Sequence, residues 1–224
     1  MTSRKLLVLG ATGRTGRLFV EQAVAAGLDV TVLVRNPGNV PPNTRAVRIV
    51  TGNLVTDSAA LHDAVPGQDA VVSTLGVGQS FKSGNLISQS APVIVAAMRQ
   101  HGVRRLVFMS AFGVGATRRD TPLLPRLFIA TLLRDVYADK QAGEQAILSS
   151  DLDWTIVYPV GLTDGPRTGR YQVGERLALT GFPRISRADV ADFLLRQVED
   201  RGYLRKGVLI APGERPVATA STPN

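Results

Sequence analysis

The stretch "GATGRTG", residues 10–16, decides the fold of this chain. An apolar run, "KLLVLG" (5–10), precedes it, and a helical pattern, "RTGRLFVEQAVAAG" (14–27), follows it. Glycine recurs in it at every third position, at Gly10, Gly13 and Gly16. A glycine-rich turn between a buried strand and a helix is typical of the first strand–helix unit of a parallel sheet.

The rest of the chain alternates between apolar runs and helical patterns in the same way. Further strands are predicted at 29–35, 46–52, 69–76, 103–110, 152–159 and 206–211. Further helices are predicted at 57–65, 85–102, over most of 121–149, and at 186–200. The strands are continuous β-branched runs, as expected where helices cover both faces of a sheet. We therefore expect an α/β fold: a three-layer, Rossmann-like, doubly wound parallel sheet.

Local signals place the ends of these elements and of the domain. Asp57 or Ser58 is the expected N-cap of one helix, and Ser186 that of the last. Pro92 either bends the helix over 85–102 or marks its true start. Residues 1–211 are expected to form a single domain with a small C-terminal lobe on the substrate side. Residues 212–224 lack periodicity, which predicts a loose tail.

Composition narrows the classes of function. The chain has 224 residues, 44% of them apolar, and no apolar run long enough to span a bilayer. It has no cysteine, which excludes disulfides and thiolate chemistry and fits a cytoplasmic protein. It has only two histidines, so we expect no metal site. The net charge is +8, but the arginines are scattered, which argues against nucleic acid and leaves anionic small ligands or plain arginine bias.

The glycine turn has the properties of a phosphate cradle. A phosphate requires backbone N–H groups pointed at it with no Cβ in the way, and a helix N-terminus adds partial positive charge. The context of strand, glycine turn and helix favours a dinucleotide site over a turn that merely packs helix on strand. The expected cofactor contacts in the turn are Gly10, Thr12, Gly13, Arg14, Thr15 and Gly16.

The end of the second predicted strand distinguishes between dinucleotides. Sites specific for NAD place a carboxylate there, whereas this chain has "VLVRNP" with Arg35. A guanidinium binds a 2′-phosphate through charge-assisted hydrogen bonds, and Arg14 can approach the same phosphate. We therefore expect NADP(H), with a solvated Arg35 as the alternative.

Two further strand ends supply candidate contacts. Asn53, after the third strand, offers a donor and an acceptor to an adenine edge. Thr74, Leu75 and Gly76 end the fourth strand at the carboxyl edge, where doubly wound sheets bind ligands. A purely structural role for Thr74 is the alternative.

Taken together, the motifs resemble a known superfamily. The segments "GATGRTG", "VLVRNP", "PGQDAVVSTLG", "VRRLVFMSAFG", "SDLDWTIVYP" and "ISRADVADFLL" are similar to the atypical short-chain dehydrogenases/reductases. Within that superfamily the chain resembles the NAD(P)H-binding group that contains flavin reductase/biliverdin-IXβ reductase and the NmrA-like proteins. The resemblance runs from the start to the last strand. It implies a Rossmann-like fold, NADP(H) binding and, in many members, hydride transfer to a flavin, quinone-like or tetrapyrrole acceptor.

The chain departs from the superfamily in its acid chemistry. Typical members place a tyrosine four residues before a lysine, so that both share one helix face. Lys140 is preceded at that distance by Val136, and Tyr137 is displaced by one position, or roughly 100° around the helix. Ser110 ends the fifth strand where a nicotinamide would lie, and it could bond the nicotinamide, a substrate carbonyl or only backbone. Ser110, Lys140 and Tyr137 are therefore the candidate catalytic residues, and Ser110 and Lys140 are also candidate cofactor contacts.

The resemblance extends to the substrate side. The family's histidine after the sixth strand is absent from "YPVGLTDG", but Pro159, Val160 and Gly161 are expected to keep their cofactor-facing backbone. Residues 76–84 and 112–135 are the expected pocket walls. Their apolar surface would come from Phe81, Phe112, Leu123 and Leu127, and their positive charge from Lys82, Arg118 and Arg119. Loops of this composition are equally typical of plain solvated loops.

Two functions of different classes fit these observations. The first is an NADPH-dependent reductase of a flavin, quinone or related conjugated acceptor, a small molecule of anionic or aromatic character. The second is a non-catalytic redox sensor of NmrA-like type, which binds the dinucleotide and acts through a protein partner. The retained Ser110 and Lys140 favour the reductase, while the displaced tyrosine favours the sensor.

Overall fold

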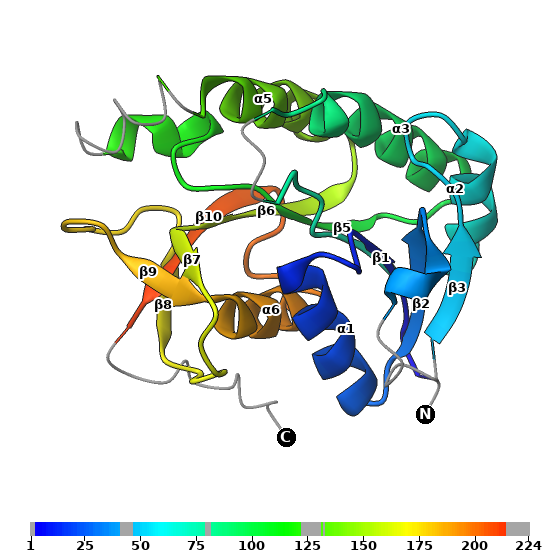
Figure 1. Ribbon diagram of the computed structural model, residues 1–224, viewed down its shortest axis with the longest axis horizontal. Coiled ribbons are helices and arrows are strands. Elements are labelled where there is room, and N and C mark those ends of the chain that lie inside the picture. Colours follow the sequence, from blue (N-terminus) through cyan, green and yellow to red (C-terminus); the bar gives the residue numbers. More distant parts are fainter. Residues whose placement is uncertain (1–2, 41–46, 79–81, 122–130, 132, 214–224) are drawn as a thin grey trace.

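The computed structural model describes residues 3–40, 47–78, 82–121, 131 and 133–213, and shows three layers (Figure 1). The central sheet contains β1 (Lys5–Leu9), β2 (Asp29–Val34), β3 (Val47–Thr51), β4 (Ala70–Ser73), β5 (Arg105–Met109), β6 (Asp153–Pro159), β8 (Tyr171–Gly174) and β10 (Lys206–Pro212). The helices are α1 (Arg14–Ala25), α2 (Ser58–Ala64), α3 (Leu86–Gln100), α5 (Arg134–Leu148) and α6 (Arg187–Arg196), with short 3-10 turns at Pro37–Asn39 and Gly115–Asp120. Figure 1 shows α2, α3 and α5 on one face of the sheet and α1 and α6 on the other.

The strand order confirms the doubly wound topology. The order is β3-β2-β1-β4-β5-β6-β10-β8, and every neighbouring pair except β10 with β8 is parallel. The direction of winding reverses between β1 and β4, which is where sheets of this kind bind ligands beyond their carboxyl ends. The predicted Rossmann-like α/β class is therefore confirmed.

Burial explains why the strands read as unbroken apolar runs. Leu7 and Leu9 of β1 pack beneath α2 and α3, while Leu6 and Val8 pack against α1 and α6. All four side chains are 0% exposed. A strand covered on both faces has no position for an exposed polar side chain, and this gives the sequence its continuous pattern.

The helix ends confirm some local predictions and correct one. The Asp57 carboxylate caps α2 by accepting from the N–H of Ala60 at 3.4 Å. The Ser186 hydroxyl caps α6 by accepting from the N–H of Asp189 at 3.0 Å. Pro92 lies inside α3, so the idea that it marks the start of that helix was wrong. Within the predicted helical segment 121–149, α5 begins at Arg134, and residues 122–130 and 132 lie outside the described part.

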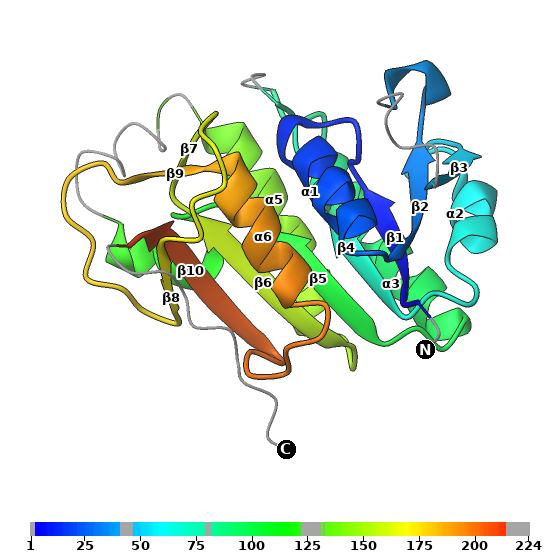
Figure 2. The same ribbon diagram turned by 90° about the horizontal axis from the view of Figure 1, so that it is seen from below.

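A small lobe follows β6, and its strands were not predicted. β7 (Gly161–Thr163) pairs with β9 (Arg184–Ser186) in a separate parallel ribbon, and β8 adds an antiparallel edge to the main sheet. Strands of three or four residues are too short to leave a periodic signal. Figure 2 shows this ribbon at the same end of the sheet as the start of α1.

The buried Asp189 of α6 holds the loop of this lobe in place. One of its carboxylate oxygens accepts from the N–H groups of Thr168 at 2.7 Å and Gly169 at 2.8 Å. Its other oxygen accepts from the Thr168 hydroxyl at 2.8 Å. The lobe is therefore tied to a core helix by three hydrogen bonds to one buried carboxylate.

The structure describes one residue beyond the last strand. β10 ends at Pro212, the first residue of the predicted tail, and residues 214–224 lie outside the described part. The domain boundary therefore stays a prediction. None of the described helices is long and apolar enough to cross a membrane.

Candidate functional site

The glycine turn packs against the end of β4 too closely for larger residues. Gly10 has a φ of +83°, and a Cβ on it would lie 2.9 Å from the carbonyl carbon of Thr74. A Cβ on Gly16 would overlap the carbonyl oxygen of Gly10. Gly13 is the N-cap of α1, and no side chain caps this helix. The first-turn N–H groups and the positive end of the helix dipole are thus left for a ligand.

Thr74 fastens the turn to the sheet. Its hydroxyl lies 3.1 Å from the carbonyl oxygen of Leu9 and 3.2 Å from that of Gly10. The side chain is buried, and it also borders the groove described next. Thr74 therefore combines the structural role with a place at the candidate ligand site.

A groove of about 250 Å³ runs from the glycine turn past the ends of β4 and β5. It brings together eight of the residues predicted to contact the cofactor: Gly13, Arg14, Thr15, Thr74, Leu75, Gly76, Ser110 and Lys140. A Cβ built on Gly76 meets nothing within 4 Å. The glycine turn follows β1 and Thr74 follows β4, and the winding of the sheet reverses between these two strands. The groove therefore lies where a dinucleotide site in this topology is expected.

The other predicted contacts lie off this groove. Arg35 is exposed directly after β2, and the Asn53 side-chain oxygen accepts from the N–H of Val55 at 3.0 Å, which leaves its amide NH₂ for a ligand. Gly10, Thr12 and Gly16 form the turn beneath the groove rather than its wall. Pro159, Val160 and Gly161 line a second cavity instead.

Arg14 links the glycine turn to the C-terminal lobe. Its guanidinium forms an ion pair with Asp164, which also pairs with Arg187 at 2.7 Å. Arg14 and Arg187 both border the groove. Arg14 thus faces the lobe in this structure.

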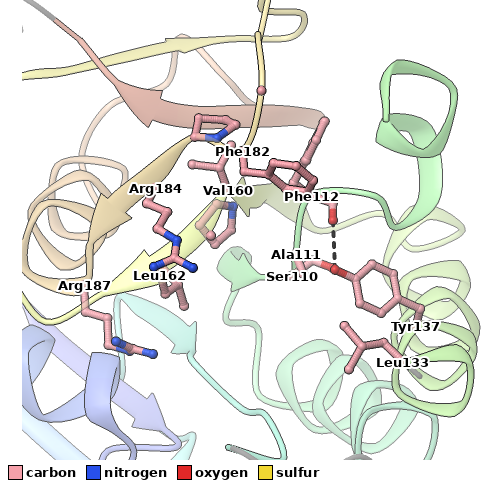
Figure 3. Close-up of a pocket in the computed structure, with 14 residues that line it drawn as sticks. Ser110, Ala111, Phe112, Leu133, Tyr137, Val160, Leu162, Phe182, Arg184 and Arg187 are labelled. Carbon is pink, nitrogen blue, oxygen red and sulfur yellow. Dashed lines mark hydrogen bonds between the residues drawn. The ribbon is translucent and has the colours of Figure 1, made fainter. Parts of the chain in front are cut away.

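The second cavity is larger, at about 450 Å³, and shares lining residues with the groove. Figure 3 shows the residues that line it. Most of its lining is apolar and comes from the end of β5, the start of α5, β7 and the chain before β9. Phe112 and Leu133 lie on it, as the predicted pocket wall 112–135 requires. Phe81, Leu123 and Leu127 lie outside the described residues, whereas Lys82, Arg118 and Arg119 are exposed and do not border the cavity. The cationic side chains on its wall are Arg184 and Arg187.

Ser110 lies where the two cavities meet, and its hydroxyl faces a buried acid. Ser110 and Ala111 border both the groove and the larger cavity. The Ser110 hydroxyl donates to Glu144 of α5, and the Tyr158 hydroxyl donates to the other oxygen of the same carboxylate at 3.0 Å. Glu144 is 1% exposed. Burial raises the pKa of Glu144, while the hydrogen bonds from Ser110 and Tyr158 and the nearby Lys140 act in the opposite direction.

Tyr137 and Lys140 border different cavities. Lys140 borders the groove, whereas Tyr137 borders the larger cavity and donates to the carbonyl oxygen of Phe112 at 3.1 Å. α5 is helical over both residues, so the displacement by one position puts the two side chains in different cavities. Burial lowers the pKa of Lys140 to about 8 and raises that of Tyr137. Val136, four residues before Lys140, borders the groove together with it, where typical members of the superfamily would have their tyrosine.

Several site residues were missed by sequence reasoning. They are Glu144, Asp164, Leu162, Phe182, Arg184 and Arg187. Glu144 carried one usable signal, because it lies four residues after Lys140 on the same helix face. The others lie on the short lobe strands, on their loops or, for Arg187, at the start of α6, and carried none.

The family comparison agrees with this geometry. A family profile described as NAD(P)H-binding matches residues 10–201, and the chain belongs to that family. Binding of NAD(P)H is the property that the glycine turn and the other motifs predicted for this chain. The resemblance stated from the motifs is confirmed.

Individual relatives are distant in sequence. The chain is 27% identical to UPF0659 protein YMR090W of Saccharomyces cerevisiae, over 97% of both chains. It is 25% identical to phenylcoumaran benzylic ether reductase 1 of Arabidopsis thaliana, over 95% of this chain and 70% of the relative.

Solved structures share the fold. A candidate NAD-dependent epimerase/dehydratase from Bacillus halodurans superposes with a TM-score of 0.80 at 24% identity, over 96% of both chains. A short-chain dehydrogenase/reductase from Veillonella parvula in complex with NADP gives 0.78 at 18% identity, over 95% of both chains. ChuY, an anaerobilin reductase from Escherichia coli O157:H7, gives 0.76 at 22% identity, over 96% of this chain and all of the other.

Proposed function

We propose that this protein is an NADPH-dependent reductase that passes a hydride to a flavin, a quinone or a similar conjugated acceptor. The observation that carries the proposal is that Ser110 and Ala111 border both the groove beside the glycine turn and the apolar cavity, so that the two cavities adjoin there. A nicotinamide supplies a hydride when it is bound. A ring held in the groove at Ser110 would face a molecule in the cavity, and this proximity is the main requirement of hydride transfer.

The proposal takes NADP(H) as the cofactor. Arg35 lies exposed after β2, at the position where NAD-specific sites carry a carboxylate. The glycine turn fits a pyrophosphate, because Gly10 and Gly16 allow it to pack tightly and the uncapped start of α1 offers N–H groups. One structural neighbour was solved with NADP.

The larger cavity suits a planar acceptor with a negative group. Phe182 is 67% exposed and lies on its wall, where its ring could stack on a conjugated molecule. Arg184 lies on the same wall, and Figure 3 shows it on the side of the cavity opposite Tyr137. We propose that Arg184 binds a carboxylate or phosphate of the acceptor.

The chain's own residues position the reactants rather than supply a tyrosine acid. The Tyr137 hydroxyl already donates to a backbone carbonyl, and it lies in a different cavity from Lys140. Lys140 borders the groove with a lowered pKa and would hold the cofactor there. Acceptors that take a hydride into a conjugated ring need no strong acid at the site.

The separation of Tyr137 and Lys140 also supports a second function. A redox sensor binds the dinucleotide without turnover and acts through a protein partner. In that case the oxidised or the reduced dinucleotide would bind preferentially, and no acceptor would be consumed.

Two measurements distinguish the functions. The first is anaerobic oxidation of NADPH by the purified protein with FMN, FAD or a soluble quinone, followed at 340 nm. Turnover that is lost in Arg184→Ala for phosphorylated flavins, and retained for an uncharged quinone, supports the reductase and the anion contact. The second is calorimetric titration with NADPH and NADP⁺, in which tight binding of NADP⁺ without turnover of any acceptor would refute the reductase and favour the sensor.

A further inference from the structure

Ser110 can hydrogen-bond a ligand in two ways, as a donor or as an acceptor. A serine hydroxyl has one proton to donate and two lone pairs to accept with. In the structure the Ser110 hydroxyl donates to the carboxylate of Glu144, a residue that borders neither cavity. Only the lone pairs of the hydroxyl are then left for a ligand.

The carboxylate is held so that it keeps this arrangement. Its second oxygen accepts from the Tyr158 hydroxyl at 3.0 Å, so both oxygens are occupied by donors. Gly115, with a φ of +51°, lies against this oxygen, and a Cβ there would also come within 3.2 Å of the Tyr158 hydroxyl. Glu144 and Tyr158 are 1% and 2% exposed, so water does not compete for these hydrogen bonds.

We infer that Glu144 is a positioning residue that makes Ser110 a hydrogen-bond acceptor, and that Ser110 thereby receives an N–H donor from the carboxamide of the nicotinamide. The inference rests on the proposed dinucleotide site, and it names the contact that orients the reactive ring. A substrate carbonyl offers no proton, so Ser110 cannot serve it while Glu144 holds the hydroxyl proton. Because the oxygen of Ser110 is polarised by a buried carboxylate, the hydrogen bond that it accepts is stronger than one to an ordinary hydroxyl.

The test uses a cofactor analogue that lacks the donor. In the 3-acetylpyridine analogue of NADP(H), a methyl group replaces the carboxamide NH₂ and the carbonyl remains. Calorimetry would compare the two dinucleotides in the same oxidation state, on the wild type and on Ser110→Ala, Glu144→Gln and Ser90→Ala. Ser90 serves as the matched control, because it is a fully buried serine of α3 whose hydroxyl has no hydrogen-bond partner among the described residues, and it borders neither cavity.

We expect the wild type and Ser90→Ala to bind the natural dinucleotide about tenfold more tightly than the analogue, the value of one good hydrogen bond. Ser110→Ala should bind both equally. Glu144→Gln should lose most of the preference, because its amide has one accepting oxygen for the two hydroxyls of Ser110 and Tyr158 and carries no charge to polarise the Ser110 oxygen, although its shape is conserved. Binding needs no turnover, so the result does not depend on identifying the acceptor.

The remaining outcomes distinguish a failure of the Ser110–Glu144 inference from a failure of the proposed function. A preference that survives in Ser110→Ala would overturn the carboxamide contact, and one that survives in full in Glu144→Gln would overturn the role of Glu144. Equal binding of both dinucleotides by the wild type would also overturn the inference, while leaving the proposed function intact. Failure of the wild type to bind either dinucleotide would overturn both.

Discussion

Replacing Lys140 with methionine should stabilise the protein at neutral pH. Lys140 is 8% exposed, and burial lowers its pKa from the ordinary 10.5 to about 8. A fall of this size corresponds to about 3 kcal/mol by which the folded protein disfavours the charged amine, at 1.36 kcal/mol per pH unit. Methionine keeps an unbranched chain of similar volume without the charge. We therefore expect Lys140→Met to raise the free energy of unfolding at pH 7 by up to about 3 kcal/mol, with part of the gain offset because Glu144 loses a neighbouring cation.

The stability difference between the wild type and Lys140→Met should depend on pH. Between about pH 8 and pH 10.5 the unfolded chain keeps a proton on Lys140 that the folded chain has lost, so the wild type gains stability as the pH rises through this range. The methionine variant lacks this gain, so its advantage should shrink by about 2 kcal/mol between pH 7 and pH 10. Urea unfolding followed by the fluorescence of Trp154, the single tryptophan, measures both proteins, and the difference between them cancels other titrations.

Either of two results would refute this reasoning: a variant less stable than the wild type at pH 7, or a difference that does not change with pH. The same substitution should weaken NADPH binding, because Lys140 borders the groove. The chain would then keep a destabilising amine because the ligand needs it.

Three further predictions test the site. Arg35→Ala should weaken NADPH binding by about ten- to a hundredfold and change NADH binding little, because a charge-assisted hydrogen bond to the 2′-phosphate is lost. Equal weakening of both dinucleotides in calorimetry would mean that Arg35 does not contact that phosphate. Tyr137→Phe should leave kcat for flavin reduction within about threefold, because its hydroxyl donates to backbone rather than to a reactant; a hundredfold loss would identify it as the acid. Gly115→Ala should lower the free energy of unfolding by at least about 1 kcal/mol more than Gly67→Ala, because both glycines have a positive φ but only Gly115 contacts the Glu144 carboxylate. Equal losses of stability in urea unfolding would show that this contact costs nothing.

The strands of the C-terminal lobe could not be predicted from the sequence. β7 and β9 contain three residues each, and they exist because they pair with each other across a long loop. Arg184 and Arg187 reach the cavity only through this pairing and the start of α6. Lys82, Arg118 and Arg119 were the expected cationic residues of the pocket, because their loops follow β4 and β5, but the order of a chain does not say which way a loop folds.

The sequence by itself determined the architecture and the position of the ligand groove. Runs of buried residues, the glycine turn and the helix caps are local patterns, and the physics that links them to strands, turns and helices acts over a few residues. Only the tertiary structure determines the hydrogen-bond partners of the Ser110 and Tyr158 hydroxyls. Glu144 lies 34 residues after it, Tyr158 lies 14 residues beyond Glu144, and they meet only because α5 packs over the ends of β5 and β6. Which partner receives the proton of a buried hydroxyl depends on that packing, and no spacing in the sequence encodes it.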